Sequence, residues 1–424
     1  MAFTIGYTPE ERVKLADAAM SEFKRIWGRY PASVASWNLD AITMAHLTTT
    51  YGIDAYAVCR DQIATDGFTI WGAPIAGYYP SKTNAWSPAL DRGHQIGTPV
   101  FRMLGQDPVY YYDHRTRLPG GQVEREPDTM EPVWTSGRSP VFVREFLKMI
   151  ADAPTMEFGY AQLGQENSFP WPDQAQAYEP QMAALARLRK EGKVHVETMG
   201  ASGRRFKRAF RTTPAQAQVM LDDPYGNAES PEGSIWYGNR FYRVDLHIKG
   251  DLPYLRDLTV YSDRSDQPFL QEATRLHEVP QRLPAILDGY HWSKRPDSLT
   301  EIGAGGFFHD GDEPLKIVGK PEVTEAGNSL HVRLPIQSGR TLILEFRERE
   351  IVARLTPSVR AKLTLAFRWD SQKSALTAVQ PKRVTYRWEG LEYDARLIEG
   401  VAHPTPDGWT VVSERKGLRI DVAQ

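Results

Sequence analysis

The feature that most constrains this chain is a change in hydrophobic periodicity near residue 225. Before this point, short apolar runs alternate with segments whose apolar residues recur every three or four positions. After it, apolar and polar residues alternate with period two, for example in residues 241–246, 363–369 and 384–388. Strands that alternate with helices are typical of parallel β/α folds, whereas period-two strands separated by turns are typical of antiparallel sheets. The sequence therefore predicts two domains, residues 1–225 and 226–424.

The first domain is predicted to be a β/α barrel. Thr8 and Pro9 begin an amphipathic helix that ends near Trp27. Apolar runs predict strands at residues 33–37, 54–60, 99–104, 158–163 and 193–200. Further helices are predicted at residues 41–50, 142–150 and 174–192. Because such barrels have about seven or eight strands, we expect a deformed (β/α) barrel that is either incomplete at its N-terminus or completed by irregular segments.

The second domain is predicted to be an all-β sandwich. Its alternating strands can place their apolar sides on a shared core and their polar sides in water. Residues 267–296 interrupt this pattern, and Leu283 and Ile286 predict a short helical connector there.

The composition argues against several classes of function. The net charge of the 424-residue chain is -2, so nucleic acid is not expected as a partner. The sequence has no run of eighteen apolar residues, and its start lacks a basic region followed by an apolar one. We therefore expect no membrane association and a cytoplasmic location, or export if the N-terminus is truncated. The single cysteine, Cys59, has no partner for an internal disulfide.

Two acidic residues that follow predicted strands are the candidates for catalysis. Glu166 follows the fourth predicted strand, and Asp107 follows the third. The carboxyl ends of barrel strands lie on one side, and glycosidic bond cleavage requires one carboxylic acid and one carboxylate. The neighbouring Phe169 and Trp171 would raise the pKa of Glu166 towards that of an acid. The alternatives are a Glu166 that accepts hydrogen bonds from loop amides and an Asp107 that initiates an Asp-Pro turn.

A second group of residues is predicted to bind the substrate. These side chains lie at strand ends or in the long loops expected to cover the barrel mouth, where tryptophans favour a sugar platform. Turn formation is the alternative for Asp66, and core packing is the alternative for each tryptophan. Asp40 is explained by default as a helix N-cap. The predicted substrate-binding residues are Asp61, Gln62, Asp66, Arg102, Glu131, Trp37, Trp71, Trp86 and Trp171.

Metal chemistry is the main alternative to a carboxylate pair. A metal-dependent deacetylase typically holds its metal with two histidines and a carboxylate. The spacings of His46, His94, His114 and His195 match no H-x-x-H, H-x-x-x-H or H-E-x-x-H motif. The sequence therefore predicts no metal site and no cofactor.

Four motifs carry a resemblance to a known superfamily: SWNLDA at residues 36–41, CRDQ at 59–62, PVFRMLGQDP at 99–108 and QEN at 165–167. Over about residues 20–260, the chain resembles bacterial proteins of the glycoside hydrolase/deacetylase superfamily. The resemblance implies a deformed barrel related to that of the polysaccharide deacetylases, followed by β-rich domains, and carbohydrate-active chemistry. The acidic and paired-histidine motifs that hold a metal in some members are absent here, which favours hydrolysis over deacetylation.

These observations predict a glycoside hydrolase that acts on an oligosaccharide or polysaccharide. In this interpretation Glu166 is the general acid/base and Asp107 is its partner. Two other hypotheses remain: a metal-dependent polysaccharide deacetylase and a non-catalytic carbohydrate-binding protein.

Overall fold

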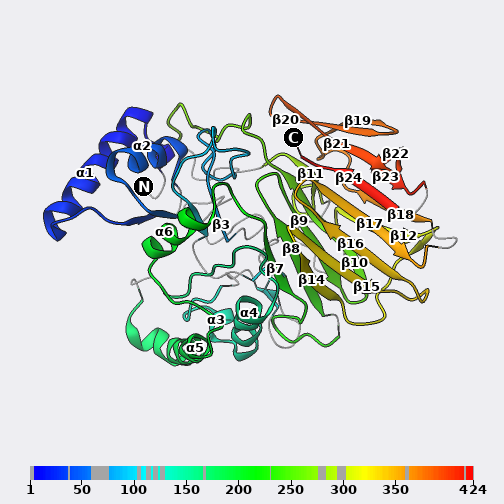
Figure 1. The fold of residues 1–424 in the computed structure, drawn as a ribbon, viewed down its shortest axis with the longest axis horizontal. Helices are drawn as coiled ribbons and strands as arrows, with labels where there is room; N and C mark the ends of the chain where they lie inside the picture. The colour runs from blue at the N-terminus through cyan, green and yellow to red at the C-terminus, as the bar shows by residue number, and fades with distance from the viewer. Residues whose placement is uncertain are drawn as a thin grey trace.

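The computed structural model describes residues 4–36, 39–58, 76–102, 107–110, 116–117, 123–124, 129–165, 169–229, 231–275, 283–293, 302–358, 362–414 and 417–423. The described residues hold few helices and many strands (Figure 1). The strands form a small mixed sheet, two large antiparallel sheets and one short ribbon, in which β5 (Thr116–Arg117) pairs with β6 (Val123–Glu124). The helices lie on one side of the large sheets (Figure 1).

The first long helix forms as predicted. After a short 3-10 turn, η1 (Thr4–Gly6), helix α1 spans Pro9–Trp27. Thr8 and Glu11 form a capping box, in which each side chain accepts from the backbone N–H of the other. The helix ends at Gly28, whose left-handed conformation (φ 71°) suits glycine.

The small sheet contains the parallel strands predicted near the N-terminus. Strands β1 (Ser33–Ala35), β2 (Ala55–Val58) and β4 (Val100–Arg102) are parallel neighbours, and β3 (Gly77–Tyr78) pairs antiparallel with β4 at the edge. Helix α2 (Ala41–Tyr51) connects β1 to β2. The side chain of Asp40 accepts from the backbone N–H of Thr43, which confirms the expectation that Asp40 is an N-cap.

The fourth and fifth predicted barrel strands do not form. Residues 158–163 and 193–198 are irregular, and the second of these segments leads into helix α6 (Met199–Ala209). The apolar pattern of the first segment reflects side-chain packing, because Phe158 and Tyr160 stack on Phe101 of β4. The described part of the chain thus has an open four-stranded sheet, and a closed barrel is not confirmed.

Three helices surround these irregular segments. Helix α3 spans Thr135–Arg138, α4 spans Pro140–Asp152, and α5 spans Trp171–Lys190. The predicted helices at residues 142–150 and 174–192 correspond to α4 and α5. No helix of the described residues is long and apolar enough to cross a membrane.

The second region consists of two large sheets. The ten-stranded sheet contains β7 (Gln216–Met220), β8 (Glu232–Gly238), β9 (Tyr242–Lys249), β10 (Leu252–Val260), β11 (Ala285–Asp288), β12 (Gly305–Asp310), β13 (Glu313–Pro314), β18 (Leu363–Arg368), β22 (Val401–Thr405) and β23 (Gly408–Val412). The eight-stranded sheet contains β14 (Glu322–Ala326), β15 (Ser329–Pro335), β16 (Thr341–Phe346), β17 (Glu350–Thr356), β19 (Leu376–Gln380), β20 (Arg383–Trp388), β21 (Leu391–Glu399) and β24 (Gly417–Asp421).

The two large sheets share one hydrophobic core. Residues such as Ile235 and Val244 from the first sheet belong to the same buried cluster as Leu334 and Leu344 from the second. The region is therefore rich in antiparallel strands, as predicted, while its finer description as a β-sandwich stays a prediction. The expected helical connector is not confirmed, because Ile286 lies in strand β11, which pairs with β10.

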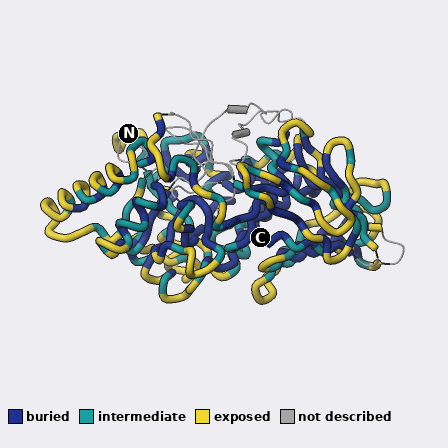
Figure 2. Tube along the Cα trace, turned by 90° about the horizontal axis from the view of Figure 1, so that it is seen from above, coloured by how far each residue is buried: buried dark blue, intermediate teal, exposed yellow. Residues whose placement is uncertain are grey.

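The ten-stranded sheet begins before the predicted domain boundary. Its edge strand β7 ends at Met220 and pairs with β8, so a division at residue 225 separates two paired strands. The N-terminal region packs against this edge: the side chain of Gln216 accepts from the N–H of Gly77 and donates to its carbonyl. Figure 2 accordingly shows buried segments through the middle of the molecule and a more exposed α1 at one end.

Candidate active site

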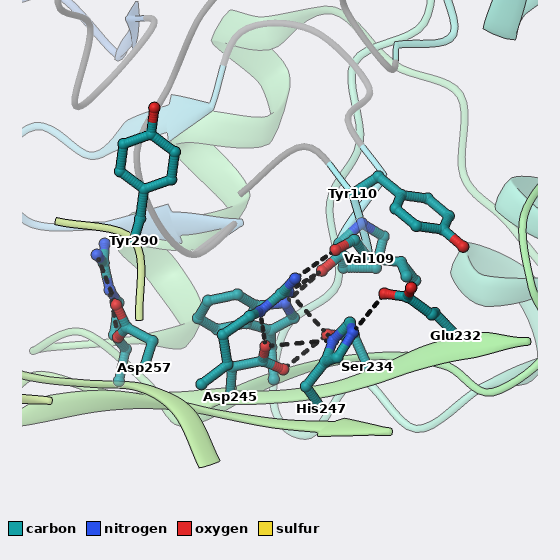
Figure 3. Close-up of polar contacts among 12 residues, drawn as sticks. Val109, Tyr110, Glu232, Ser234, Asp245, His247, Asp257 and Tyr290 are labelled. Atoms are coloured by element: carbon teal, nitrogen blue, oxygen red, sulfur yellow. Dashed lines mark hydrogen bonds and ion pairs between the residues drawn. The ribbon is translucent and has the colours of Figure 1, made fainter. Parts of the chain in front are cut away.

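Strands β8, β9 and β10 have two buried faces of opposite chemistry. One face carries apolar side chains and packs in the core shared by the large sheets. The other face carries charged and polar side chains, each no more than 5% exposed, and is directed towards the N-terminal region (Figure 3). This polar face consists of Glu232, Ser234, Trp236, Arg243, Asp245, His247, Arg256, Asp257 and Thr259.

The charges of the polar face are paired across neighbouring strands. Arg256 Nε lies 2.6 Å from Asp245 Oδ2, and Arg243 Nε lies 3.1 Å from Asp257 Oδ1. Burial raises the pKa of Asp245 to about 6, although the charge of Arg256 opposes this rise. Buried charges are tolerated only when they are paired and hydrogen-bonded, and this pairing fixes the side chains in place.

A histidine joins two of the strands on the same face. His247 Nε2 lies 3.0 Å from Glu232 Oε2, and His247 Nδ1 lies 3.4 Å from Ser234 Oγ. The Ser234 hydroxyl donates to Asp245 and accepts from Arg256. Ser234 is therefore held in a network of ionised groups, and both it and His247 are fully buried.

The loop that follows β4 lies on this polar face. Arg256 donates from Nη1 to the carbonyl of Val109 (2.5 Å) and from Nη2 to the carbonyl of Pro108 (3.0 Å). Trp236 Nε1 also donates to the Pro108 carbonyl, at 2.7 Å. Residues 108 and 109 thus lie against the charged side of the ten-stranded sheet.

Asp107 begins this loop and is buried, with 2% of its surface exposed. Its Oδ1 accepts from the N–H groups of Val109 (2.6 Å) and Tyr110 (3.1 Å), which is the turn-initiating geometry expected of an Asp-Pro pair. Burial raises the pKa of the Asp107 carboxyl to about 7; the two amides and Arg256 oppose the rise, and Asp223 adds to it. The hydroxyl of Tyr110 donates to Asp223 at 2.6 Å.

Glu131 lies in a second buried loop and contacts the segment that leads to Glu166. Its Oε1 accepts from Gln165 Nε2 at 3.2 Å, and its Oε2 accepts from Trp134 Nε1 at 3.2 Å. The backbone N–H of Val133 in turn donates to the side chain of Gln165. The sequence predicted only that Glu131 lies in a loop over the barrel mouth, and its contact with Gln165 was not expected.

A cleft of about 510 Å³ lies beside the same segment. Its walls come from residues 158–163, residues 193–197, helices α4 to α6 and strand β7. Gln218 of β7 lies directly opposite Trp236 of β8, so the cleft borders the polar face. The polar side chains that line it are Thr155, Tyr160, Gln162, Lys193, His195, Glu197, Ser202, Arg205 and Gln218.

The remaining predicted residues lie in different surroundings. Arg102 is buried at the end of β4. Trp86 is 1% exposed and packs in the hydrophobic cluster with Tyr78 and Val100, which is the environment of a core residue. Trp171 begins α5, is 54% exposed, and contacts the ring of Tyr178. Glu166, Asp61, Gln62, Asp66, Trp37 and Trp71 lie outside the described residues.

Sequence reasoning missed the polar face of β8 to β10. Charged residues at every second position of a strand normally indicate a solvated face, so the pattern of Arg243, Asp245 and His247 predicts a surface in water. The available indication was that both Arg and Asp occur in two neighbouring strand segments, at Arg243 and Asp245 and at Arg256 and Asp257. Such a pattern indicates a buried polar face only when another part of the chain is known to cover the strands.

One group of side chains in the described part of the chain has a geometry that suits a metal ion. Single ligand atoms of Asp91, His94 and Asp263 lie within 4.8 Å of one another. His94 Nδ1 is 3.0 Å from Asp91 Oδ2, and both side chains are more than half exposed, so an ordinary surface ion pair accounts for the contact. The group has one histidine where a deacetylase typically uses two.

Comparison with known proteins shows a similarity of fold. No family model and no curated protein matches this chain. A solved structure from Parabacteroides distasonis, with the provisional name glycoside hydrolase/deacetylase, is similar with a TM-score of 0.51 and 17% sequence identity. The similarity covers 66% of this chain and 68% of the other. It shows a related fold.

Proposed function

We propose that this protein is a carbohydrate-active enzyme that hydrolyses glycosidic bonds, with Asp107 as the general acid. The observation that supports this role is the buried Asp107 carboxyl in the loop after β4, whose pKa is raised to about 7. A carboxyl with this pKa is still largely protonated in weakly acidic solution and can give its proton to a leaving oxygen. The related fold of the similar structure is consistent with the proposal.

Glu166 is the proposed second carboxylate. The segment that leads to it is joined to the buried loop at Glu131 through Gln165. In a glycosidase the second carboxylate either attacks the sugar or activates water, and the separation of the two carboxyl groups determines which of these occurs. Relative to the sequence prediction, the roles are exchanged: Asp107 is proposed as the acid, and Glu166 as nucleophile or base.

The proposed substrate is an oligosaccharide or polysaccharide. Sugar rings require both apolar surface and hydrogen-bonding groups, and the cleft supplies both, with Tyr160 and Gln218 among its lining residues. We propose Arg102, Glu131, Asp61, Gln62 and Asp66 as the polar groups around the reacting sugar. Trp37, Trp71 and Trp171 are the tryptophans that remain proposed as platforms, because Trp86 is enclosed in the core.

The test is hydrolysis of a panel of aryl glycosides and polysaccharides by Asp107→Asn. Loss of a general acid is expected to lower the rate about 10²- to 10⁴-fold. The loss should be small on dinitrophenyl glycosides, because their leaving group needs no proton. The exposed Asp312→Asn serves as the matched control. A wild-type rate for Asp107→Asn on unactivated substrates would refute the assignment.

The same panel separates the other two hypotheses. Acetylated polysaccharides should release no acetate if the proposal is right. Acetate release that a chelator abolishes would instead identify a metal-dependent deacetylase. Binding of polysaccharide by the wild-type protein without any turnover would identify a carbohydrate-binding protein.

A further inference from the structure

We infer that Arg256 is a positioning residue for Asp107, so that the ten-stranded sheet forms part of the active site. This inference rests on the proposed function, because it concerns the acid that the proposal names. The inference goes beyond the proposed function by assigning a role to a side chain from the second region of the chain.

The geometry centres on two consecutive peptide groups. The first joins Pro108 to Val109, and the second joins Val109 to Tyr110. In both, the N–H donates to Asp107 Oδ1, and in both, the carbonyl accepts from the guanidinium of Arg256. Because a peptide group is planar and rigid, fixing its carbonyl also fixes the direction of its N–H. Arg256 therefore orients the two donors that hold the Asp107 carboxyl.

Arg256 is itself held from the opposite side. Its Nε lies 2.6 Å from Asp245 Oδ2, and its Nη2 donates to the Ser234 hydroxyl at 3.2 Å. The side chain is buried, and its guanidinium lies 5.7 Å from the ring centre of Trp236. The guanidinium reaches two carbonyls and a carboxylate through three separate nitrogens of one rigid plane, whereas the lysine ammonium is a single compact centre, so lysine is a poor substitute.

Among the described residues, the charged and titratable groups that act on Asp107 come from three parts of the chain. Arg256 approaches from β10, Asp223 from the turn after β7, and Tyr110 from the loop itself. Arg256 lowers the pKa of Asp107 and Asp223 raises it. Removing the Arg256 guanidinium should therefore raise the pKa of Asp107, because its positive charge and the oriented N–H groups of Val109 and Tyr110 both favour the ionised carboxylate.

The experiment compares Arg256→Met and Arg256→Lys with Arg243→Lys. Arg243 is a matched control, since it lies on the same face and pairs with Asp257. In Arg256→Met, kcat on an aryl glycoside should fall about tenfold or more with a smaller change in KM. The alkaline limb of the pH–rate profile should also move to higher pH. A loss of folded protein alone would lower the amplitude without moving the limb.

A second measurement keeps the test independent of turnover. The titration of the Asp107 carboxyl, followed by carbon-13 NMR of labelled aspartate, should move upwards in Arg256→Met and stay unchanged in Arg243→Lys. If no glycoside is hydrolysed by the wild type but this titration moves, the proposed function fails and the positioning role stands. If Arg256→Met does not fold, Trp236→Phe removes one donor to the Pro108 carbonyl and should give a smaller shift of the same sign. An unchanged Asp107 titration in the folded variants overturns the inference.

Discussion

Trp236 and Pro108 are joined by a hydrogen bond from the indole Nε1 to the carbonyl oxygen, 2.7 Å long, although 128 residues separate them in the chain. This contact connects the loop after β4 of the small mixed sheet to the polar face of the ten-stranded sheet. It lies beside the contacts of Arg256 with the same loop. The two regions that the sequence pattern distinguishes thus share a buried interface.

A first prediction concerns the two regions as separate fragments. A fragment of residues 1–225 would contain β7 without its partner β8 and would expose the buried side of the Asp107 loop. We expect it to lack a cooperative urea transition, because unpaired strand edges and exposed apolar surface favour aggregation. Circular dichroism and urea unfolding check this against the full chain. A cooperative transition in the isolated fragment would show that the interface is not needed for folding.

A second prediction concerns the pH dependence of stability. The pKa of Asp107 is about 7 in the folded protein and near 4 in an unfolded chain. The folded state therefore binds this proton more tightly. The resulting stabilisation is fully present below about pH 4 and is lost as the pH rises through about 7.

Asp107→Asn removes this titration. The difference in unfolding free energy, wild type minus variant, should therefore fall by a few kcal/mol between about pH 4 and pH 8. Urea unfolding of both proteins across this range measures the difference, and the other carboxylates cancel because both proteins contain them. A difference that is constant with pH would contradict the raised pKa.

A third prediction concerns Glu131. Both oxygens of its carboxylate accept hydrogen bonds, one from Gln165 and one from Trp134. In Glu131→Gln the new NH₂ group replaces one of these oxygens, so it faces an N–H donor that it cannot accept from. We expect a loss of about 1–3 kcal/mol in unfolding free energy. Activity should also fall by more than the loss of folded protein explains, since Gln165 precedes Glu166. Glu179→Gln, on the exposed side of α5, is the control and should be neutral in both measurements.

A fourth prediction concerns the packing of helix α6 on strand β2. A Cβ atom at Gly203 would lie 2.0 Å from the backbone carbonyl oxygen of Asp54, closer than any contact allows. Gly203→Ala should therefore push α6 away and lower the unfolding free energy by about 1–3 kcal/mol or more. Gly97→Ala, where no atom lies within 4 Å, is the control and should be close to neutral. Equal stability of the two variants would show that α6 adjusts without cost.

Local signals predicted the local structure well. Helix α1 begins at the capping box of Thr8 and Glu11, and strands β2 and β4 form where buried apolar runs end before polar loops. The period-two segments after residue 225 are strands of antiparallel sheets. These features depend on near neighbours in the chain, which is why the pattern alone sufficed.

Features that depend on distant contacts could not be predicted in this way. Residues 158–163 looked like a strand because Phe158 and Tyr160 are apolar, yet they pack by their rings and pair with no strand of the described chain. Asp107 was identified as a strand-end carboxylate. Its raised pKa, however, results from burial, and the loop that contains it lies against Trp236 and Arg256, more than a hundred residues away in the chain. A pattern of alternating charge does not reveal whether water or protein covers it.

One side of β9 is apolar and the other is charged, and both are buried, so the folded state tolerates no change in the pairing register of this strand. A shift by one residue would exchange the two sides of the strand. The apolar side chains Val244, Leu246 and Ile248 would then face the ion pairs. The polar side chains Arg243, Asp245 and His247 would enter the hydrophobic core between the large sheets. In a strand with one side in water, the same shift would bury polar side chains but would expose the apolar ones only to solvent. Single-residue insertions or deletions within β9 should therefore abolish folding, whereas the same changes in the hairpin turn at Gly250 should be far better tolerated.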